Sequence, residues 1–150
     1  MANRLTYVRE ELYNYLEEIQ GYTIRTEFSI DSWKQDEPYI HLRLEGEDFE
    51  TDNYESSLPR TTDSDMVLGA YVGFEAKDND DFEKAKEEAA ETVRKHLRTF
   101  NIDDYGDDDG TETRFSYIVP RQWQSVMRDN NYGLLYYTFI LKFILVKVDL

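Results

Sequence analysis

The chain has 150 residues, of which 40% are hydrophobic and 15% aromatic, enough for one domain with a packed core. Its 17 lysines and arginines stand against 32 aspartates and glutamates, and the resulting net charge of −15 disfavours binding to phosphate backbones. The sequence has no cysteine, which excludes disulfides and thiolate chemistry, and its first residues lack the apolar run of a signal peptide.

The first predicted element is an amphipathic helix over residues 3–20, with Gly21 as its C-terminal cap. Apolar residues recur there at steps of three and four, which places them on one stripe: Leu5, Val8, Leu12, Leu16 and Ile19. Two alternating runs follow, Tyr22–Ile30 and Ile40–Glu45, and both predict strands. The polar connector between them predicts that the two strands pair as a hairpin with a long turn.

A third strand is predicted over Met66–Ala76, because every second residue there is apolar. Gly69 and Gly73 fall on its other face, where they can admit a close neighbour or a bulge. The preceding segment, 46–64, is too long for a tight turn and carries many acids, among them Glu47, Asp48, Glu50 and Asp52. Loops of this length are usually functional or disordered, and the sequence leaves both readings open.

A second helix is predicted from a capping box, Asp80 with Glu83, through to Asn101. Its apolar stripe consists of Phe82, Ala85, Ala89, Val93, Leu97 and Phe100. A second acidic loop, 103–112, follows with six acids and no base, and it includes Asp107, Asp108 and Asp109.

The rest of the chain predicts a strand over Arg114–Val119, a polar connector over Arg121–Asn131 and a long final strand from Tyr132 to Val148. That last segment, 132–150, is mostly apolar, but two lysines interrupt it, so we interpret it as a strand and not as a membrane helix. Because strands are usually much shorter, part of it is expected to reach outside the domain. The predicted fold is a single α+β domain over residues 1–150. Its mostly antiparallel or mixed sheet has about five strands, with two helices packed on it.

No motif in the sequence predicts catalysis or a cofactor. An EF-hand register with Gly110 at its sixth position puts Tyr105 at the first and Ser116 at the twelfth, and a register on Gly106 also fails. The two histidines, His41 and His96, stand on different elements and lack a partner at ligand spacing. Phosphate-binding, dinucleotide-binding and nucleophile-elbow motifs are absent. We therefore expect a protein that is not an enzyme and has no cofactor or metal.

Charge is distributed unevenly along the chain. From Thr113 onward there are five bases against two acids, a net charge of +3, so residues 1–112 carry −18. A mildly basic, aromatic-rich end and acidic loops elsewhere suit packing against another copy, although the same bases can simply decorate a sheet whose other face is buried. The candidate subunit-interface residues are Arg121, Trp123, Met127, Arg128 and Lys142. The tryptophan can equally cover a sheet edge.

The order of these elements resembles the tail terminator, or tail completion, proteins of long-tailed bacteriophages. The resemblance lies in the two helical stripes, Leu5–Ile19 and Phe82–Phe100, the strand Met66–Ala76 that leads into the second helix, and the extended strand Tyr132–Val148. It covers nearly the whole chain in element order, size and charge, and rests on no specific motif.

The resemblance implies a homo-oligomeric, hexameric ring that caps the tail tube, contacts the tail tube protein and docks onto the head connector. The protein would then be part of the virion, and would lie in the host cytoplasm during assembly. DNA would pass through the lumen without being specifically bound, because acids repel a polyanion. The candidate lumen or rim acids are Glu47, Asp48, Glu50, Asp52, Asp107, Asp108 and Asp109.

A second hypothesis is a monomeric acidic inhibitor, such as an immunity protein or a DNA mimic, that binds a basic nuclease. A mimic should keep its acids on rigid helices and strands at phosphate-like spacing. The densest acidic clusters are predicted to lie in loops that contain glycine, which favours the ring.

Overall fold

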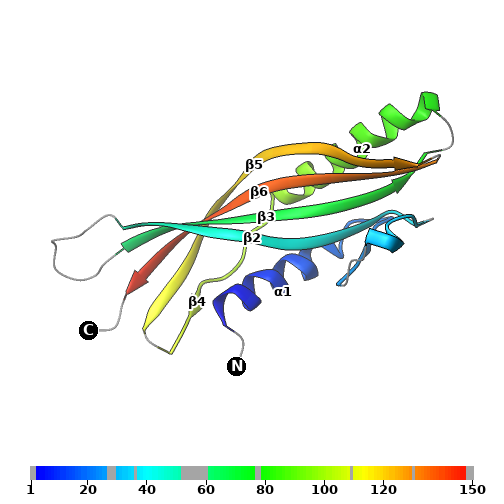
Figure 1. Ribbon diagram of the computed structural model, residues 1–150. Helices are drawn as coiled ribbons and strands as arrows, with labels where there is room; N and C mark the ends of the chain where they lie inside the picture. Colours follow the sequence, from blue (N-terminus) through cyan, green and yellow to red (C-terminus); the bar gives the residue numbers. More distant parts are fainter. Residues whose placement is uncertain are drawn as a thin grey trace.

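The computed structural model describes residues 3–26, 30–35, 37–51, 61–76, 79–108, 110–129 and 131–147. The strands form one six-stranded mixed sheet in the order β1-β2-β3-β6-β5-β4, and two α-helices pack on one of its faces (Figure 1). The fold is therefore α+β, as predicted, with one strand more than expected.

Helix α1, Arg4–Leu16, begins after Asn3, whose side chain accepts a hydrogen bond of 2.8 Å from the backbone N–H of Thr6. Its predicted stripe is confirmed, because Val8, Leu12 and Leu16 are fully buried. The helix ends four residues earlier than predicted. The following turn contains Gly21 at a φ of 85°, a conformation that costs glycine little.

The predicted hairpin between the first two strands is wrong. Strand β1 has only two residues, Thr23–Ile24, and it pairs in parallel with the start of β2, Tyr39–Thr51. The reason is tertiary: the Arg25 guanidinium donates to the carbonyl and hydroxyl oxygens of Ser32 and lies 4.8 Å from the centre of the Tyr39 ring. These contacts hold Ser32, at the end of the short 3-10 helix η1 (Ile30–Ser32), near Arg25 and the start of β2.

In the described part of the segment 46–64, all residues belong to strands and not to the predicted long loop. Strand β2 continues to Thr51 and β3, Thr61–Glu75, pairs with it from Thr62 onward, while residues 52–60 lie outside the described part of the chain. A bulge at Glu45 interrupts the register between Leu44 and Gly46. Sequence periodicity misses this extension because the added residues are mostly polar and the hydrogen-bonded ladder itself keeps them extended.

The final strand, β6, Tyr132–Lys147, lies between β3 and β5 and pairs with both along nearly its whole length. Its predicted bounds are confirmed to within one residue, but the expectation that part of it leaves the domain is wrong, because β6 is the central strand. The predicted apolar face of β3 is also confirmed: Met66, Leu68, Ala70, Val72 and Phe74 are all buried.

Strand β5, Thr111–Asp129, corrects the prediction of a short strand followed by a connector. It runs on through Pro120, with bulges at Ser116, Arg121 and Val126. Proline is tolerated there because β5 has an unpaired outer edge, where a missing N–H removes no ladder hydrogen bond. The two-residue strand β4, Tyr105–Gly106, pairs with β5 only at Glu112 and Thr113.

Helix α2, Asn79–Arg98, begins one residue before the predicted cap at Asp80 and ends three residues before the predicted end at Asn101. Its apolar stripe from Phe82 to Leu97, together with Phe100 just after it, packs on the same face of the sheet as α1. The two helices are tied together near their C-terminal ends. The Tyr15 hydroxyl donates to the carbonyl oxygen of His96 at 2.7 Å, and the two rings lie 4.7 Å apart.

Aromatic rings lie over glycines on neighbouring strands. A Cβ atom at Gly69 would fall 1.9 Å from the Tyr136 hydroxyl oxygen, and one at Gly73 would fall 2.1 Å from the Tyr39 ring. The interpretation of these glycines as sites of close approach is therefore confirmed, and the approaching groups are tyrosines.

Replacement of Gly69 by alanine should destabilise the protein by about 1–3 kcal/mol, because the Tyr136 ring must move off the sheet to admit the methyl group. Urea unfolding measures the change. Gly46→Ala is the matched control, since a Cβ there meets nothing within 4 Å, and it should change stability by no more than about 0.5 kcal/mol. Equal losses in the two variants would contradict this account of Gly69.

Candidate assembly surface

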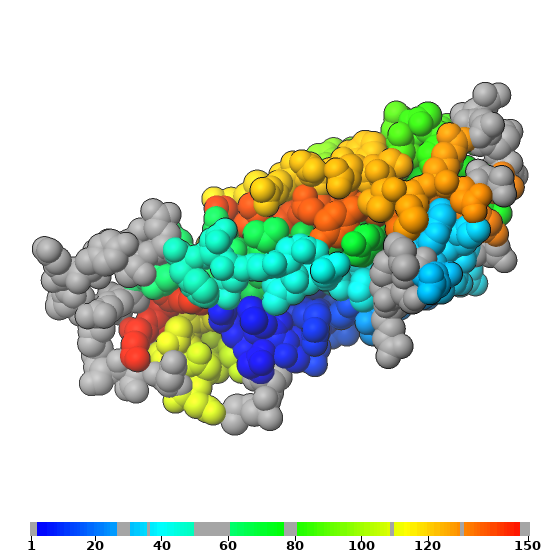
Figure 2. Space-filling view, in the orientation of Figure 1, coloured from blue at the N-terminus to red at the C-terminus, as the bar shows by residue number. Residues whose placement is uncertain are grey.

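One face of the sheet carries both helices, and the opposite face, here called the open face, carries none of the described α-helices. Figure 2 looks onto the open face, with β6 and β3 in its centre, β5 along its upper border and β2 along its lower border. At one end the segment 30–35 reaches over it, and the Lys34 ammonium lies 2.6 Å from the carboxylate of Asp129. The rest of the open face is the candidate contact surface.

A tyrosine pair occupies the middle of the open face. The rings of Tyr71 and Tyr136 lie 4.6 Å apart, and the Tyr136 hydroxyl donates to the carboxylate of Glu45 at the β2 bulge. Burial raises the pKa of Tyr136, and the hydrogen bond to the Glu45 carboxylate raises it further. The glycines of β3 were the sequence signal for this cluster, but they did not indicate which rings cover them.

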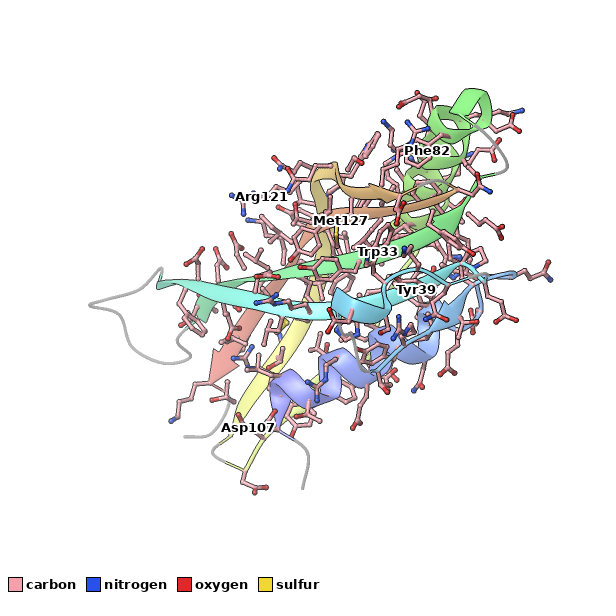
Figure 3. The ribbon with its side chains drawn as sticks, turned by 45° about the vertical axis from the view of Figure 1, so that its right-hand side comes forward. Trp33, Tyr39, Phe82, Asp107, Arg121 and Met127 are labelled. Atoms are coloured by element: carbon pink, nitrogen blue, oxygen red, sulfur yellow. The ribbon has the colours of Figure 1, made fainter. Side chains whose placement is uncertain are left out.

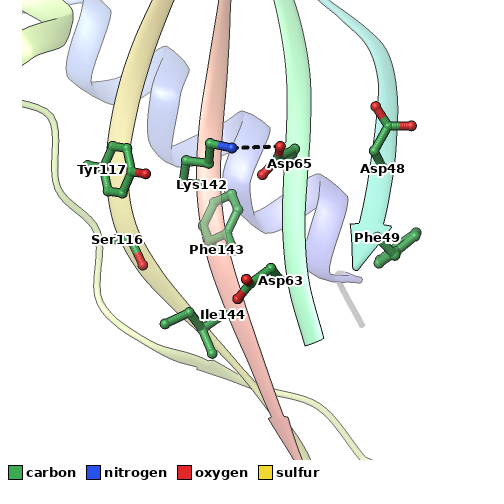
Figure 4. Close-up of a pocket in the computed structure, with 9 residues that line it drawn as sticks. All are labelled: Asp48, Phe49, Asp63, Asp65, Ser116, Tyr117, Lys142, Phe143 and Ile144. Carbon is green, nitrogen blue, oxygen red and sulfur yellow. Dashed lines mark hydrogen bonds and ion pairs between the residues drawn. The ribbon is translucent and has the colours of Figure 1, made fainter. Parts of the chain in front are cut away.

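A cleft of about 520 Å³ lies on the open face, toward the end of the sheet opposite the Lys34–Asp129 pair (Figure 4). Residues of β2, β3, β6 and β5 line it. The Lys142 ammonium lies 2.7 Å from the carboxylate of Asp65, and this hydrogen bond raises the pKa of Lys142. Asp63 and Asp48 also line the cleft, and Asp48 forms no ion pair with any described residue. The cleft therefore offers carboxylate oxygens to a cationic group of a partner.

The predicted lumen acids do not form one set. Glu47 points to the helix face and is largely buried: its carboxylate accepts two hydrogen bonds from Arg4, one of 2.8 Å, and another from Ser64. Asp48 and Glu50 lie on β2, while Asp52 falls outside the described residues. No local sequence pattern indicates the Arg4–Glu47 pair, because its members are 43 residues apart.

The remaining predicted acids lie at the turn between β4 and β5. Asp107 accepts a hydrogen bond of 3.1 Å from the backbone N–H of Thr111 and stands at the opposite end of the molecule from Phe82 (Figure 3). Asp108 is exposed beside it, and Asp109 falls outside the described residues. The segment that joins β4 to β5 lies toward the same end of the molecule as the end of β2 and the start of β3 (Figure 1).

The predicted interface residues divide between β5 and the neighbouring strand β6. Arg121 sits in a bulge of β5, projects away from the sheet (Figure 3) and forms no ion pair with a described residue. Trp123 is 40% exposed, and the Lys86 ammonium lies 6.0 Å from its ring centre. The Arg128 guanidinium packs 3.8 Å from the centre of the Phe82 ring.

The other two predicted interface residues lie deeper in the sheet. Met127 is half-buried on the open face of β5, and Lys142 lies on β6, where Asp65 binds it. The structure thus places Arg121 and Trp123 on the exposed strand, but separates both from Lys142.

Two strands leave an outer edge unpaired over most of their length. Beyond the two residues that pair with β4, and beyond Arg114, whose guanidinium lies 3.8 Å from the Asp104 carboxylate, β5 has no paired strand on its outer side from Phe115 to Met127 among the described residues. Strand β2 pairs with β1 only at Tyr39 and Ile40, and the Tyr13 hydroxyl donates to the carbonyl oxygen of Leu42, so in the described part of the chain its outer edge has no paired strand from Arg43 onward. Unpaired edges are templates for pairing with another chain.

Exposed apolar side chains concentrate on these same two strands. Among the described residues, six large hydrophobic side chains are 37–57% exposed, and five of them belong to β2 or β5. They are Leu44 and Phe49 on β2, and Tyr117, Trp123 and Val126 on β5. The two edges therefore combine free backbone groups with apolar surface, as protein contact sites do.

Within the described residues no group of three or more histidine, aspartate or glutamate side chains is arranged to hold a metal ion. The Nδ1–H of His41 donates to the carbonyl oxygen of Arg25 and the Nε2–H of His96 donates to that of Tyr15, so the two rings serve separate local contacts. None of the described helices is long and apolar enough to cross a membrane.

No protein-family model matches the chain, and a search of curated proteins finds no significant similarity.

Arg4→Ala should lower the free energy of unfolding by about 1–3 kcal/mol, because it leaves the Glu47 carboxylate partly buried without its charged partner. Arg94→Ala is the control: Arg94 pairs with Glu91 three residues away on the exposed surface of α2, where solvent screens the pair, so the loss should be much smaller than for Arg4→Ala. Thermal unfolding of both variants measures the difference. An Arg4 variant no less stable than the Arg94 variant would show that the pair does not hold α1.

Stability should fall above about pH 10, the ordinary pKa of tyrosine, and Tyr136 should contribute to that fall. Its folded pKa is raised, so its stabilising contribution is complete below the unfolded pKa and is lost as the pH rises toward the folded pKa. Urea unfolding at pH 7 and pH 10.5 should show a smaller loss for Tyr136→Phe than for the wild type. Equal losses of stability between pH 7 and pH 10.5 in the wild type and in Tyr136→Phe would contradict the contribution of Tyr136.

Proposed function

We propose that the protein is a structural subunit that assembles with copies of itself into a ring at the head–tail junction of a long-tailed bacteriophage. In this role the ring terminates the tail tube and joins it to the head connector. The observation that carries the proposal is the pair of unpaired sheet edges, β2 and β5, each bearing exposed apolar side chains. A subunit with two such edges on opposite sides can bind one copy on each side.

The open face is the proposed lumen surface. It bears the carboxylates of Asp48, Asp63 and Asp65 around the cleft, whereas the helices occupy the other face. A lumen with excess carboxylates lets DNA pass because it repels the phosphate backbone. No catalytic step is part of this function.

The inhibitor hypothesis must be weighed again, because acids at 48, 63 and 65 lie on rigid strands and not in loops. That removes one ground on which the sequence disfavoured a DNA mimic. A mimic, however, needs uncompensated acids, and several strand acids here are paired within the molecule: Glu45 with Arg43, Glu47 with Arg4 and Asp65 with Lys142. The internal pairing still favours the assembly subunit.

Electron microscopy and light scattering of the purified full-length protein test the proposal. We expect rings with a central hole, and a mass that is a whole multiple of 17.9 kDa, six-fold for a hexamer. Addition of purified tail tubes should place the ring at one tube end. A stable monomer that binds a basic nuclease tightly and ignores tail tubes would establish the inhibitor instead.

A further inference from the structure

We infer that the β5 edge of one copy pairs antiparallel with the β2 edge of the next copy, so that one continuous sheet crosses the subunit boundary. The inference rests on the proposed self-assembly and specifies its interface. The segments involved are residues 114–124 of β5 and residues 43–51 of β2, away from the ends tied down by β1 and by the Lys34–Asp129 pair.

Charge distinguishes the two edges. Between Arg114 and Asp129, β5 carries three arginines and one aspartate, a formal charge of +2. Between His41 and Thr51, β2 carries one arginine against four acids, a formal charge of −3 if the histidine is neutral. Pairing β5 with β5, or β2 with β2, brings like charges together, whereas pairing β5 with β2 brings opposite charges together.

Strand direction agrees with this pairing. The contacts β2–β3, β3–β6 and β6–β5 are all antiparallel, so β5 runs opposite to β2. A second copy placed beside the first in the same orientation therefore presents its β2 antiparallel to β5. Repetition of this one contact between unlike edges gives a closed ring when the rotation that relates neighbouring copies is a whole fraction of 360°.

The register places matching charges near one another. Through the paired residues Ile144 and Asp63, Arg114 lies in the same row of the sheet as Glu50. Copies aligned at the same height thus put the Arg114 end of β5 beside the acidic end of the neighbouring β2. The exposed side chains of Tyr117 and Phe49 lie close to this level and would be covered by the contact.

Charge reversal of each edge, separately and together, tests the interface in the full-length protein. The β5 variant is Arg114→Glu with Arg121→Glu, and the β2 variant is Glu45→Lys with Asp48→Lys. Each should weaken self-association at least about tenfold, because both edges of every copy then carry the same sign. The quadruple variant, which combines all four substitutions and so reverses both edges, should restore association to within about threefold of the wild type.

The restoration discriminates between the possible contacts. If the contact were a symmetric β5–β5 pair, the quadruple variant would self-associate as weakly as the β5 variant. If it were a symmetric β2–β2 pair, the quadruple variant would self-associate as weakly as the β2 variant. Matched controls reverse two exposed charges away from both edges: Lys84→Glu with Lys95→Glu on α2, and Glu17→Lys with Glu18→Lys after α1. Circular dichroism and thermal unfolding establish that each variant is folded before its mass is measured.

The outcomes separate this interface from the proposed function. A wild-type protein that remains monomeric at every concentration, with or without tail tubes, overturns both. If rings persist in the β5 and β2 variants, or if the quadruple variant stays dissociated, the β5–β2 contact is wrong, but the proposed ring is not contradicted. The sequence has no cysteine, so disulfides between single cysteines on β5 and β2 provide a second measurement. Such disulfides should form when the β5 cysteine variant and the β2 cysteine variant are mixed, and should not form in a sample of either variant alone.

Discussion

The two-residue periodicity of the central strand is the constraint on which the rest of the structure depends. Successive side chains of β6 point to opposite faces, and Leu135, Tyr137, Phe139, Leu141 and Phe143 all point to the face where the helices pack. Burial of those side chains favours that face for both helices, since the other face of β6 presents Tyr136, Thr138 and Lys142 among its side chains. The open face, and with it the candidate contact surface, is therefore a consequence of how the core is built.

The same arrangement leaves the sheet with two unlike borders. A sheet that closes on itself has no edges, and one that stays open must protect them. Here β5 has three bulges, a proline and exposed arginines, which disfavour pairing with an identical edge. The β2 edge has a bulge and a run of acids. Features that prevent unspecific association of like edges are compatible with one specific contact between unlike edges.

Some of the acidic side chains stabilise the fold through ion pairs with distant bases. Arg4, at the start of α1, reaches across to Glu47 on β2 and fixes the helix against the sheet, while Lys142 neutralises Asp65 in the cleft. The sequence assigned Glu47 to a lumen because a count of acids along a loop cannot tell a paired carboxylate from a free one. Which acids remain available to a partner is decided by contacts between distant residues. Asp48 is one such acid.

Periodicity alone determined the two helices, the buried face of β3 and the extent of β6, because each is a local pattern of apolar residues repeated over many positions. The glycines at 69 and 73 likewise indicated a close approach. Only the tertiary structure decided that β1 is parallel to β2, that β5 runs on through Pro120, and that β2 continues past Leu44 to Thr51. Those features depend on hydrogen bonds and ion pairs between residues far apart in the chain, and a one-dimensional pattern carries no information about which strand lies beside which.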